Sequence, residues 1–226
     1  MFSPDEIKTW DTICHIHVDN LISRVLNECS HVLGTDLNII DIGSNTGTFI
    51  SLLEGRGVKI KNALLIEPVP ELLEYSRNKF KNKNYIFKNI ALSDKRGTLR
   101  LERSETPDNL GINIMGQIPS DGSDEDIIQV YSFDELNFSN FVPDIIKIDA
   151  EGMDFKVIQG MQSYIASLQK KPIIIAESNG YASISPENAV LLLKVQKLLH
   201  DLNYSIPPLT EWSTDLPFLE NDHVPV

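Results

Sequence analysis

Short apolar runs alternate with amphipathic stretches along most of the chain. Five of the runs are rich in isoleucine, leucine and valine, with little polar alternation, which is typical of strands buried on both faces of a sheet. These runs are residues 37–42, 63–66, 85–90, 145–148 and 173–176. Helical patterns occur at residues 48–53, 70–80, 153–168 and 186–202. The alternation predicts βαβ units in a single α/β domain, with a mostly parallel sheet and helices on both faces.

Two parts of the chain depart from this alternation. Residues 1–36 carry apolar side chains at roughly helical spacing and predict one or two helices beside the sheet. Residues 94–140 contain several glycines and prolines but no long helical pattern, and only 98–102 and 127–131 look like short strands. Because so irregular a stretch in a compact domain is often functional, we expect an insertion or lid over the carboxyl edge of the sheet, with residues 120–126 as its acidic tip.

Size and composition place the chain among ordinary globular proteins. Its 226 residues suffice for one substantial core, and its hydrophobic (42%) and charged (23%) fractions exclude disordered and fibrous classes. No apolar run approaches the roughly 18 residues that cross a bilayer, and the N-terminus lacks a signal-peptide pattern. We therefore expect a cytoplasmic protein without membrane insertion. A net charge of −12 opposes binding to the phosphates of nucleic acid.

The first candidate site is the loop Asp41-Ile-Gly-Ser-Asn-Thr-Gly47, between the first apolar run and a helix. Its glycines allow a tight turn and close approach to a ligand, although an ordinary strand-to-helix turn has the same need. The loop lacks a third glycine of the dinucleotide fingerprint, and Asp41 would repel a pyrophosphate but attract a cationic aminoacyl group. The loop therefore favours S-adenosylmethionine over NAD. The candidate cofactor-binding residues are Asp41, Gly43, Ser44, Asn45, Gly47 and Thr48, where the helix N-terminus is expected to present free N–H groups.

Further candidates follow the second and third runs. Glu67, before Pro68, stands where an acid in nucleotide-binding α/β folds accepts both ribose hydroxyls, although a lone acid there is often only a solvated charge. Small and apolar residues around Ala91 can flank an adenine ring, and Asn89 or Ser93 can hydrogen-bond its edge. Their value is positional, because ligands of open α/β sheets lie across the carboxyl ends of the strands.

The fourth run ends in the sharpest local motif, Lys147-Ile-Asp-Ala-Glu-Gly152. Asp149 and Glu151 emerge together at the carboxyl edge, and Lys147 lies on the same side of the strand as Asp149, where it can pair with a carboxylate. Because two close carboxylates raise the pKa of one of them, Asp149 and Glu151 are the candidate general bases. Alternatively, Asp149 caps the following turn or holds the aminoacyl group of the cofactor.

A divalent metal is a further alternative at the same edge. Asp149 ends the fourth run, and Glu177 and Asn179 follow the fifth. Carboxylate and amide oxygens of this kind suit Mg²⁺, which keeps several of its waters when bound to protein. A magnesium site with Asp149, Glu177 and Asn179 as ligands therefore remains open.

Together these motifs resemble the FkbM-type methyltransferases. The resemblance covers approximately residues 37–180, and the Lys-Ile-Asp-Ala-Glu-Gly element is its most specific part. It implies a class I (Rossmann-like) methyltransferase fold over residues 37–226, with S-adenosylmethionine as methyl donor. It also implies, usually, O-methylation of a hydroxyl on a sugar, glycan or small natural product. Ser44 departs mildly from the family, which commonly has alanine there.

The resemblance leaves the acceptor open. A methyltransferase with an N-nucleophile or protein acceptor is one alternative, and an inactive nucleoside-binding module is another, although the intact acids argue against the latter. For the fold, we expect the five strands in the order 3-2-1-4-5 with right-handed crossovers. A strand pair from residues 204–206 and 223–226 should extend the sheet.

Overall fold

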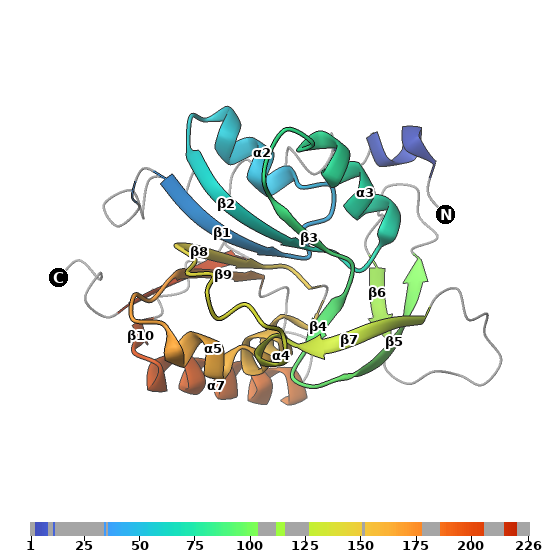
Figure 1. Cartoon of the computed structure of the whole chain (residues 1–226). Helices are drawn as coiled ribbons and strands as arrows, with labels where there is room; N and C mark the ends of the chain where they lie inside the picture. The colour runs from blue at the N-terminus through green and yellow to red at the C-terminus, as the bar shows by residue number, and fades with distance from the viewer. Residues whose placement is uncertain are drawn as a thin grey trace.

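The computed structural model describes residues 3–8, 11, 34, 36–103, 112–115, 127–150, 152–177, 186–205 and 215–220. The first half of the chain forms the strands of one half of the main sheet and the helices on one of its faces (Figure 1). This half contains β1 (Asp36–Ile42), α2 (Thr48–Gly55), β2 (Lys59–Ile66), α3 (Pro70–Lys79) and β3 (Ile86–Lys88). Residues 4–8 and 11 are helical, as predicted, and most of the remaining N-terminal segment lies outside the described ranges.

The second half of the chain completes the main sheet and adds helices on its other face (Figure 1). It contains β8 (Ile145–Ile148), α4 (Asp154–Gly160), α5 (Gln162–Ser167), β9 (Ile173–Glu177), α7 (Pro186–Asp201), β10 (Tyr204–Ser205) and β11 (Asp215–Glu220). Among the described residues the strand order is β10-β11-β9-β8-β1-β2-β3. Because β3, β2, β1, β8 and β9 are parallel neighbours, the predicted order of the five apolar runs is confirmed.

The chain after α7 adds two antiparallel strands at the β9 edge. β10 lies within the predicted strand 204–206, and β11 pairs with both β10 and β9. The prediction of the second strand at 223–226 is wrong, because the strand that pairs with β10 is 215–220, and residues 221–226 lie outside the described ranges. Pro217 obscures this strand in the sequence, since a proline lacks the N–H of a ladder position.

The interval from 94 to 140 is more regular than its sequence indicates. It contains β5 (Gly97–Arg103), β6 (Ile112–Met115), β7 (Ile127–Ser132) and the 3-10 helix η2 (Phe133–Glu135). Together with β4 (Ala91–Ser93), the described part of this interval forms a second sheet of order β4-β7-β5-β6. The predicted strands 98–102 and 127–131 lie within β5 and β7, whereas the predicted acidic tip at 120–126 lies outside the described residues.

The chain passes from one sheet to the other within a few residues. β3 is shorter than the predicted 85–90, because the chain leaves the main sheet after Lys88 and enters the second sheet at Ala91. β4 pairs in parallel with β7. Gly160 of α4 packs tightly against β4, since a Cβ atom at this glycine would lie 2.0 Å from the carbonyl oxygen of Ser93. α4 therefore ties the second sheet to the helical layer.

The helix predicted over 153–168 is divided at Met161 into α4 and α5. Asp134 of η2 explains the break, because its carboxylate accepts hydrogen bonds from the N–H groups of Ser163 (2.9 Å) and Tyr164 (2.8 Å). These groups lie in the first turn of α5, where N–H groups have no partner within the helix. A side chain 29 residues away from Ser163 thus caps a new helix.

The two faces of the main sheet bury separate apolar clusters. Side chains alternate along β1, so Leu37 and Ile39 pack with the residues of α2, whereas Ile40 and Ile42 pack with those of α4, α5 and α7. Every side chain of β8 is buried, including the charged Lys147. In the part of the chain that the structure describes, no helix is long and apolar enough to cross a membrane.

Candidate functional site

The loop between β1 and α2 passes close to the carboxyl end of β8. Gly43 has a φ of 67°, a conformation that favours glycine, and its N–H donates to the carbonyl of Ile66 at 2.9 Å. A Cβ atom at this position would lie 1.7 Å from the backbone oxygen of Asp149. The backbone conformation and the lack of space therefore both require glycine, and the close neighbour is the chain itself.

The N–H groups of residues 43–47 all donate to acceptors of the protein itself. The acceptors are the Ile66 carbonyl for Gly43 and Ser44, Glu67 Oε2 for Asn45, Asn45 Oδ1 for Thr46 and the Ser44 carbonyl for Gly47, at 2.8–3.1 Å. The free N–H groups expected at the helix start near Thr48 stay a prediction, whereas the N–H groups that precede Thr48 are used. This part of the loop therefore offers no cradle of N–H groups for a phosphate.

The loop instead presents hydrogen-bond acceptors. Asp41 is fully buried; its Oδ1 has the ammonium of Lys147 at 3.5 Å, and among the described residues its Oδ2 has no hydrogen-bond donor. The same holds for the buried hydroxyl oxygen of Ser44. Burial raises the pKa of Asp41, Lys147 lowers it, and the net direction is upward. A buried polar atom without a partner is costly, so these oxygens indicate where a donor or a cation would bind.

Lys147 connects β8 to this loop. It lies opposite Asp41 in the parallel pairing of β1 with β8. Its Nζ donates to the carbonyl of Gly43 at 2.9 Å, and it lies 3.1 Å from Asp149 Oδ2 and 3.5 Å from Asp41 Oδ1. Lys147 thus pairs with carboxylates, as its position along the strand indicated. One ammonium group thus faces two carboxylates.

Glu67 ends the strand next to the loop. Its Oε2 accepts the N–H of Asn45 at 2.8 Å, and its Oε1 accepts that of Val69 at 2.9 Å. Burial raises the pKa of Glu67 to about 7, although these hydrogen bonds lower it. A carboxylate has about four acceptor sites, so two remain after the two amides are counted. These two suit a pair of hydroxyl donors.

The residues predicted to contact adenine lie where the chain passes from the main sheet to the second sheet. Asn89 lies between β3 and β4, where its side-chain nitrogen donates to the carbonyls of Glu67 and Pro68 at 2.9 and 2.8 Å. Both of its donors hold the Glu67-Pro68 segment, so its oxygen is the atom left to accept from an adenine amino group. Ala91 and Ser93 lie buried in β4, and the hydroxyl of Ser93 donates to Asp94.

Of the two predicted general bases, Asp149 and Glu151, the structure describes only Asp149. Asp149 follows β8 with 39% of its side chain exposed, the most accessible carboxylate of those that contact Lys147. Glu151 lies outside the described residues. Asp154, in the first turn of α4, accepts the N–H groups of Ala150 and Gly152 and so fixes the turn after Asp149. Burial raises the pKa of Asp154 to about 6.

Of the predicted metal ligands, the structure describes the side chain of Asp149 and only the backbone of Glu177. Ile148 pairs with Ala176 in the parallel register of β8 with β9, so Asp149 and Glu177 follow neighbouring positions. The side chain of Glu177 is not described, and Asn179 lies outside the described residues. Within the described ranges, no group of three His, Cys, Asp or Glu residues could hold a metal ion. Magnesium binding stays a prediction.

One residue that the sequence patterns did not single out also contacts the loop. Asp11, from the N-terminal helical residues, accepts hydrogen bonds from the hydroxyls of Thr46 and Thr48. The available signal was an acid within an apolar helical pattern, but its partners are 35 and 37 residues away in the sequence. Such distant contacts do not follow from periodicity.

Comparison with known proteins identifies methyltransferases among the relatives of this chain. The model of the methyltransferase FkbM domain matches residues 41–206. The hexuronic acid methyltransferase AglP of Haloferax volcanii is 27% identical over 162 residues, which are 70% of this chain and 62% of AglP. The crystal structure of methyltransferase FkbM from Methylobacillus flagellatus KT has a TM-score of 0.54 and 17% identity, over 82% of this chain and 44% of that one, which shows a shared fold.

The chain thus spans less than two thirds of the length of both relatives. The domain match, in contrast, includes the glycine loop, the Glu67-Pro68 pair and the Lys147–Gly152 motif. It covers well over half of the chain. The chain therefore belongs to the FkbM family of methyltransferases.

Proposed function

We propose that this chain transfers a methyl group from S-adenosylmethionine to a hydroxyl group of a sugar, a glycan or another small molecule. The observation that carries the proposal is the chemistry of the glycine loop. Its N–H groups from 43 to 47 are used internally, whereas Asp41 Oδ2 and the Ser44 hydroxyl lack hydrogen-bond partners among the described residues, and Asp41 Oδ1 has Lys147 at 3.5 Å. A site that offers acceptors and negative charge suits a cationic ligand better than a dinucleotide.

The described residues fit the parts of this donor. The acceptor oxygens of Asp41 and Ser44 suit its cationic aminoacyl group, and the two remaining acceptor sites of Glu67 suit the ribose hydroxyls. The oxygen of Asn89 suits the adenine amino group. When bound, S-adenosylmethionine supplies a methyl group on a positively charged sulfur, where a nucleophile can displace it.

Of the two candidate bases, Asp149 is the one that the structure describes, and it can accept the proton of the acceptor hydroxyl. It lies at the same edge as the loop, its side chain is partly exposed, and Lys147 holds one of its oxygens at 3.1 Å. The other oxygen is thus the one available to an incoming hydroxyl group. Asp154 supports this arrangement by fixing the turn that follows. A positioned base contributes roughly 10²–10⁴-fold to the rate of such a reaction, and Glu151 remains the second candidate.

The family relationship supports a sugar acceptor. AglP, which matches the chain at 27% identity, is named for methylation of a hexuronic acid. The resemblance to FkbM-type enzymes points to a hydroxyl group as the acceptor. No described residue favours an N-nucleophile, a protein acceptor or an inactive module over this assignment.

Two measurements test the proposal. Calorimetry with S-adenosylmethionine, and with NADH as the matched negative ligand, should show binding of the first only. Methyl transfer from labelled donor to a panel of hexoses and hexuronic acids, with and without EDTA, should then label a sugar. Alkaline treatment should leave the label in place, because an ether resists it whereas an ester of the uronic carboxyl does not. Binding of NADH but not of S-adenosylmethionine would refute the proposal, and loss of activity in EDTA would indicate the metal.

A further inference from the structure

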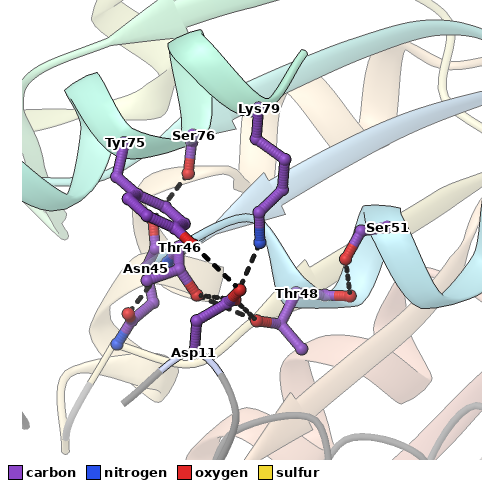
Figure 2. A network of polar contacts seen from close by, with 8 residues as sticks. All are labelled: Asp11, Asn45, Thr46, Thr48, Ser51, Tyr75, Ser76 and Lys79. Atoms are coloured by element: carbon purple, nitrogen blue, oxygen red, sulfur yellow. Dashed lines mark hydrogen bonds and ion pairs between the residues drawn. The ribbon is translucent and has the colours of Figure 1, made fainter. Parts of the chain in front are cut away.

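A buried acid from the N-terminal segment lies at the centre of a polar network beside the glycine loop (Figure 2). Asp11 Oδ1 accepts hydrogen bonds from Thr46 Oγ1 at 2.7 Å, Thr48 Oγ1 at 2.8 Å and Lys79 Nζ at 2.7 Å. Its Oδ2 accepts the phenol of Tyr75 at 3.3 Å. Three segments, namely the N-terminal residues, the loop and α3, therefore meet at one carboxylate.

The network is largely shielded from water. The side chains of Asp11 and Lys79 are 12% and 20% exposed, so their ion pair is less screened than one on the surface. Burial opposes the ionisation of Asp11, but the hydrogen bonds from Lys79 and the threonines outweigh it, and its pKa lies below the ordinary value. Breaking one partner of such a pair costs more than breaking an exposed one.

α3 also holds the loop directly. Ser76 Oγ donates to the carbonyl of Asn45 at 2.9 Å, as Figure 2 shows. A Cβ atom at Gly47 would lie 2.6 Å from the ring of Phe80, so loop and helix are in close contact. Asn45 itself has a φ of 50°, which is uncommon for a residue other than glycine and persists only where its surroundings hold it.

The strained residue of the loop is also the one that orients Glu67. The N–H of Asn45 donates to Glu67 Oε2, and the next residue, Thr46, binds Asp11. A path of direct contacts therefore runs from Asp11 through Thr46 and Asn45 to the carboxylate proposed to bind the ribose. Asp11 lies outside the residues 41–206 that match the family.

We propose that Asp11 is a positioning residue for the methyl donor: it locks the loop from Asn45 to Thr48 onto α3, and so keeps Glu67 in its binding orientation. This inference rests on the proposed function. Because Asp11 contacts the loop and α3 rather than the reacting atoms, its loss should weaken donor binding and leave the chemical step nearly unchanged. A loop that must be ordered on binding lowers the affinity by the free energy of ordering.

The test compares Asp11→Asn with Glu6→Gln, a control on the same segment whose exposed carboxylate contacts only Ser3 in the hydrogen bonds described for it. Calorimetry with S-adenosylhomocysteine should show the Kd raised on the order of tenfold in Asp11→Asn and unchanged in the control. In steady-state assays, KM for the donor should rise while kcat at saturating donor stays within about twofold. A purely structural role would lower Tm without this division between KM and kcat.

Lys79→Met provides a second variant if Asp11→Asn does not fold. Its matched control is Lys83→Met, which removes a 2.6 Å ion pair with Glu54 away from the loop. Lys79→Met should raise the Kd for S-adenosylhomocysteine, and Lys83→Met should not. If the wild-type chain binds S-adenosylhomocysteine and both Asp11→Asn and Lys79→Met bind it equally well, the inference about Asp11 is overturned, but the proposed function is not. If the wild-type chain does not bind it, the proposed function and the inference fall together.

Discussion

The ammonium group of Lys147 donates a hydrogen bond to the backbone carbonyl of Gly43 across 2.9 Å. This bond joins the strand that carries the candidate base to the loop that is proposed to bind the donor. The same ammonium group compensates the buried charge of Asp41 at 3.5 Å. Lys147 therefore both stabilises the buried Asp41 and fixes the position of the glycine loop relative to β8.

Lys147→Met should be strongly destabilising. Removing one partner of a buried ion pair leaves the other charge buried without compensation, which costs about 3–5 kcal/mol in the free energy of unfolding. Urea unfolding measures this loss. Lys170→Met is the control, because its pair with Asp144 is 57% exposed on the lysine side and should cost less than about 1 kcal/mol. Adding Asp41→Asn to Lys147→Met should recover part of the loss, and equal losses in both lysine variants would contradict this account.

Gly43→Ala should destabilise the chain by roughly 2–5 kcal/mol, since a left-handed backbone and a collision with the Asp149 carbonyl act together. Gly57→Ala separates the two effects. Gly57 also has a positive φ, of 84°, but no atom lies within 4 Å of its Cβ position, so it should cost only about 1–2 kcal/mol. Urea unfolding of both variants checks the difference, and a smaller loss at Gly43 than at Gly57 would show that the contact with Asp149 is not tight.

Glu67→Ala should weaken binding of S-adenosylmethionine by roughly 1–3 kcal/mol, the scale of hydrogen bonds from a hydroxyl pair to a charged group. Glu74→Ala, an exposed change on α3, is the control for calorimetry. An unchanged Kd in Glu67→Ala would remove Glu67 from the site.

The pH dependence of donor binding should follow the ionisation of the Glu67 carboxylate. Its pKa is about 7, and the ionised form accepts both hydroxyls, so affinity should fall as the pH is lowered from about 8 to about 6. Stability without ligand should change in the opposite direction. Because the folded pKa lies above the ordinary 4.5, the contribution of Glu67 to stability is lost as the pH rises from about 4.5 through about 7. Calorimetry and unfolding across this range measure the two trends, and parallel trends would contradict the assignment.

Asp149→Asn should lower kcat on the order of 10²–10⁴-fold and leave donor affinity nearly intact if Asp149 takes the proton of the acceptor. The rise of the wild-type rate with pH should disappear in this variant. Glu151→Gln is the comparison, since the true base is the residue whose amide abolishes the rise. Loss of donor binding in both variants would mean that the acids hold the donor. Partial rescue by added Mg²⁺ would favour a metal bound by Asp149 and Glu177.

Much of the fold and part of the site could be predicted from the sequence because they depend on local patterns. The five apolar runs identified the parallel strands, and the positions of Asp41 near the end of its run and of Glu67 directly after its own placed both acids at one edge. The division of the helix at Met161 could not be predicted, because its cause is Asp134 in another element. Likewise, β11 contains a proline, and its pairing with β9 and β10 makes it a strand.

The contacts within the site show the same limit. That Lys147 could pair with a carboxylate followed from their spacing along one strand, but its bond to Gly43 spans 104 residues. Asp11 and Thr46 are 35 residues apart and meet only because the N-terminal segment folds against the loop. Sequence patterns thus supplied the candidate residues, while the tertiary fold decides which of them touch.

The pairing of β1 with β8 has a consequence for how the chain folds during synthesis. Asn38 in β1 and Asp144, just before β8, are hydrogen-bonded although they are 106 residues apart, and contacts of such sequence separation form slowly. At roughly 5–20 residues per second, translation takes on the order of 5–20 s to supply β8 after β1. During that time one edge of β1 is an open strand edge, which is prone to aggregation. The nascent chain therefore needs protection longest at the strand that carries Asp41.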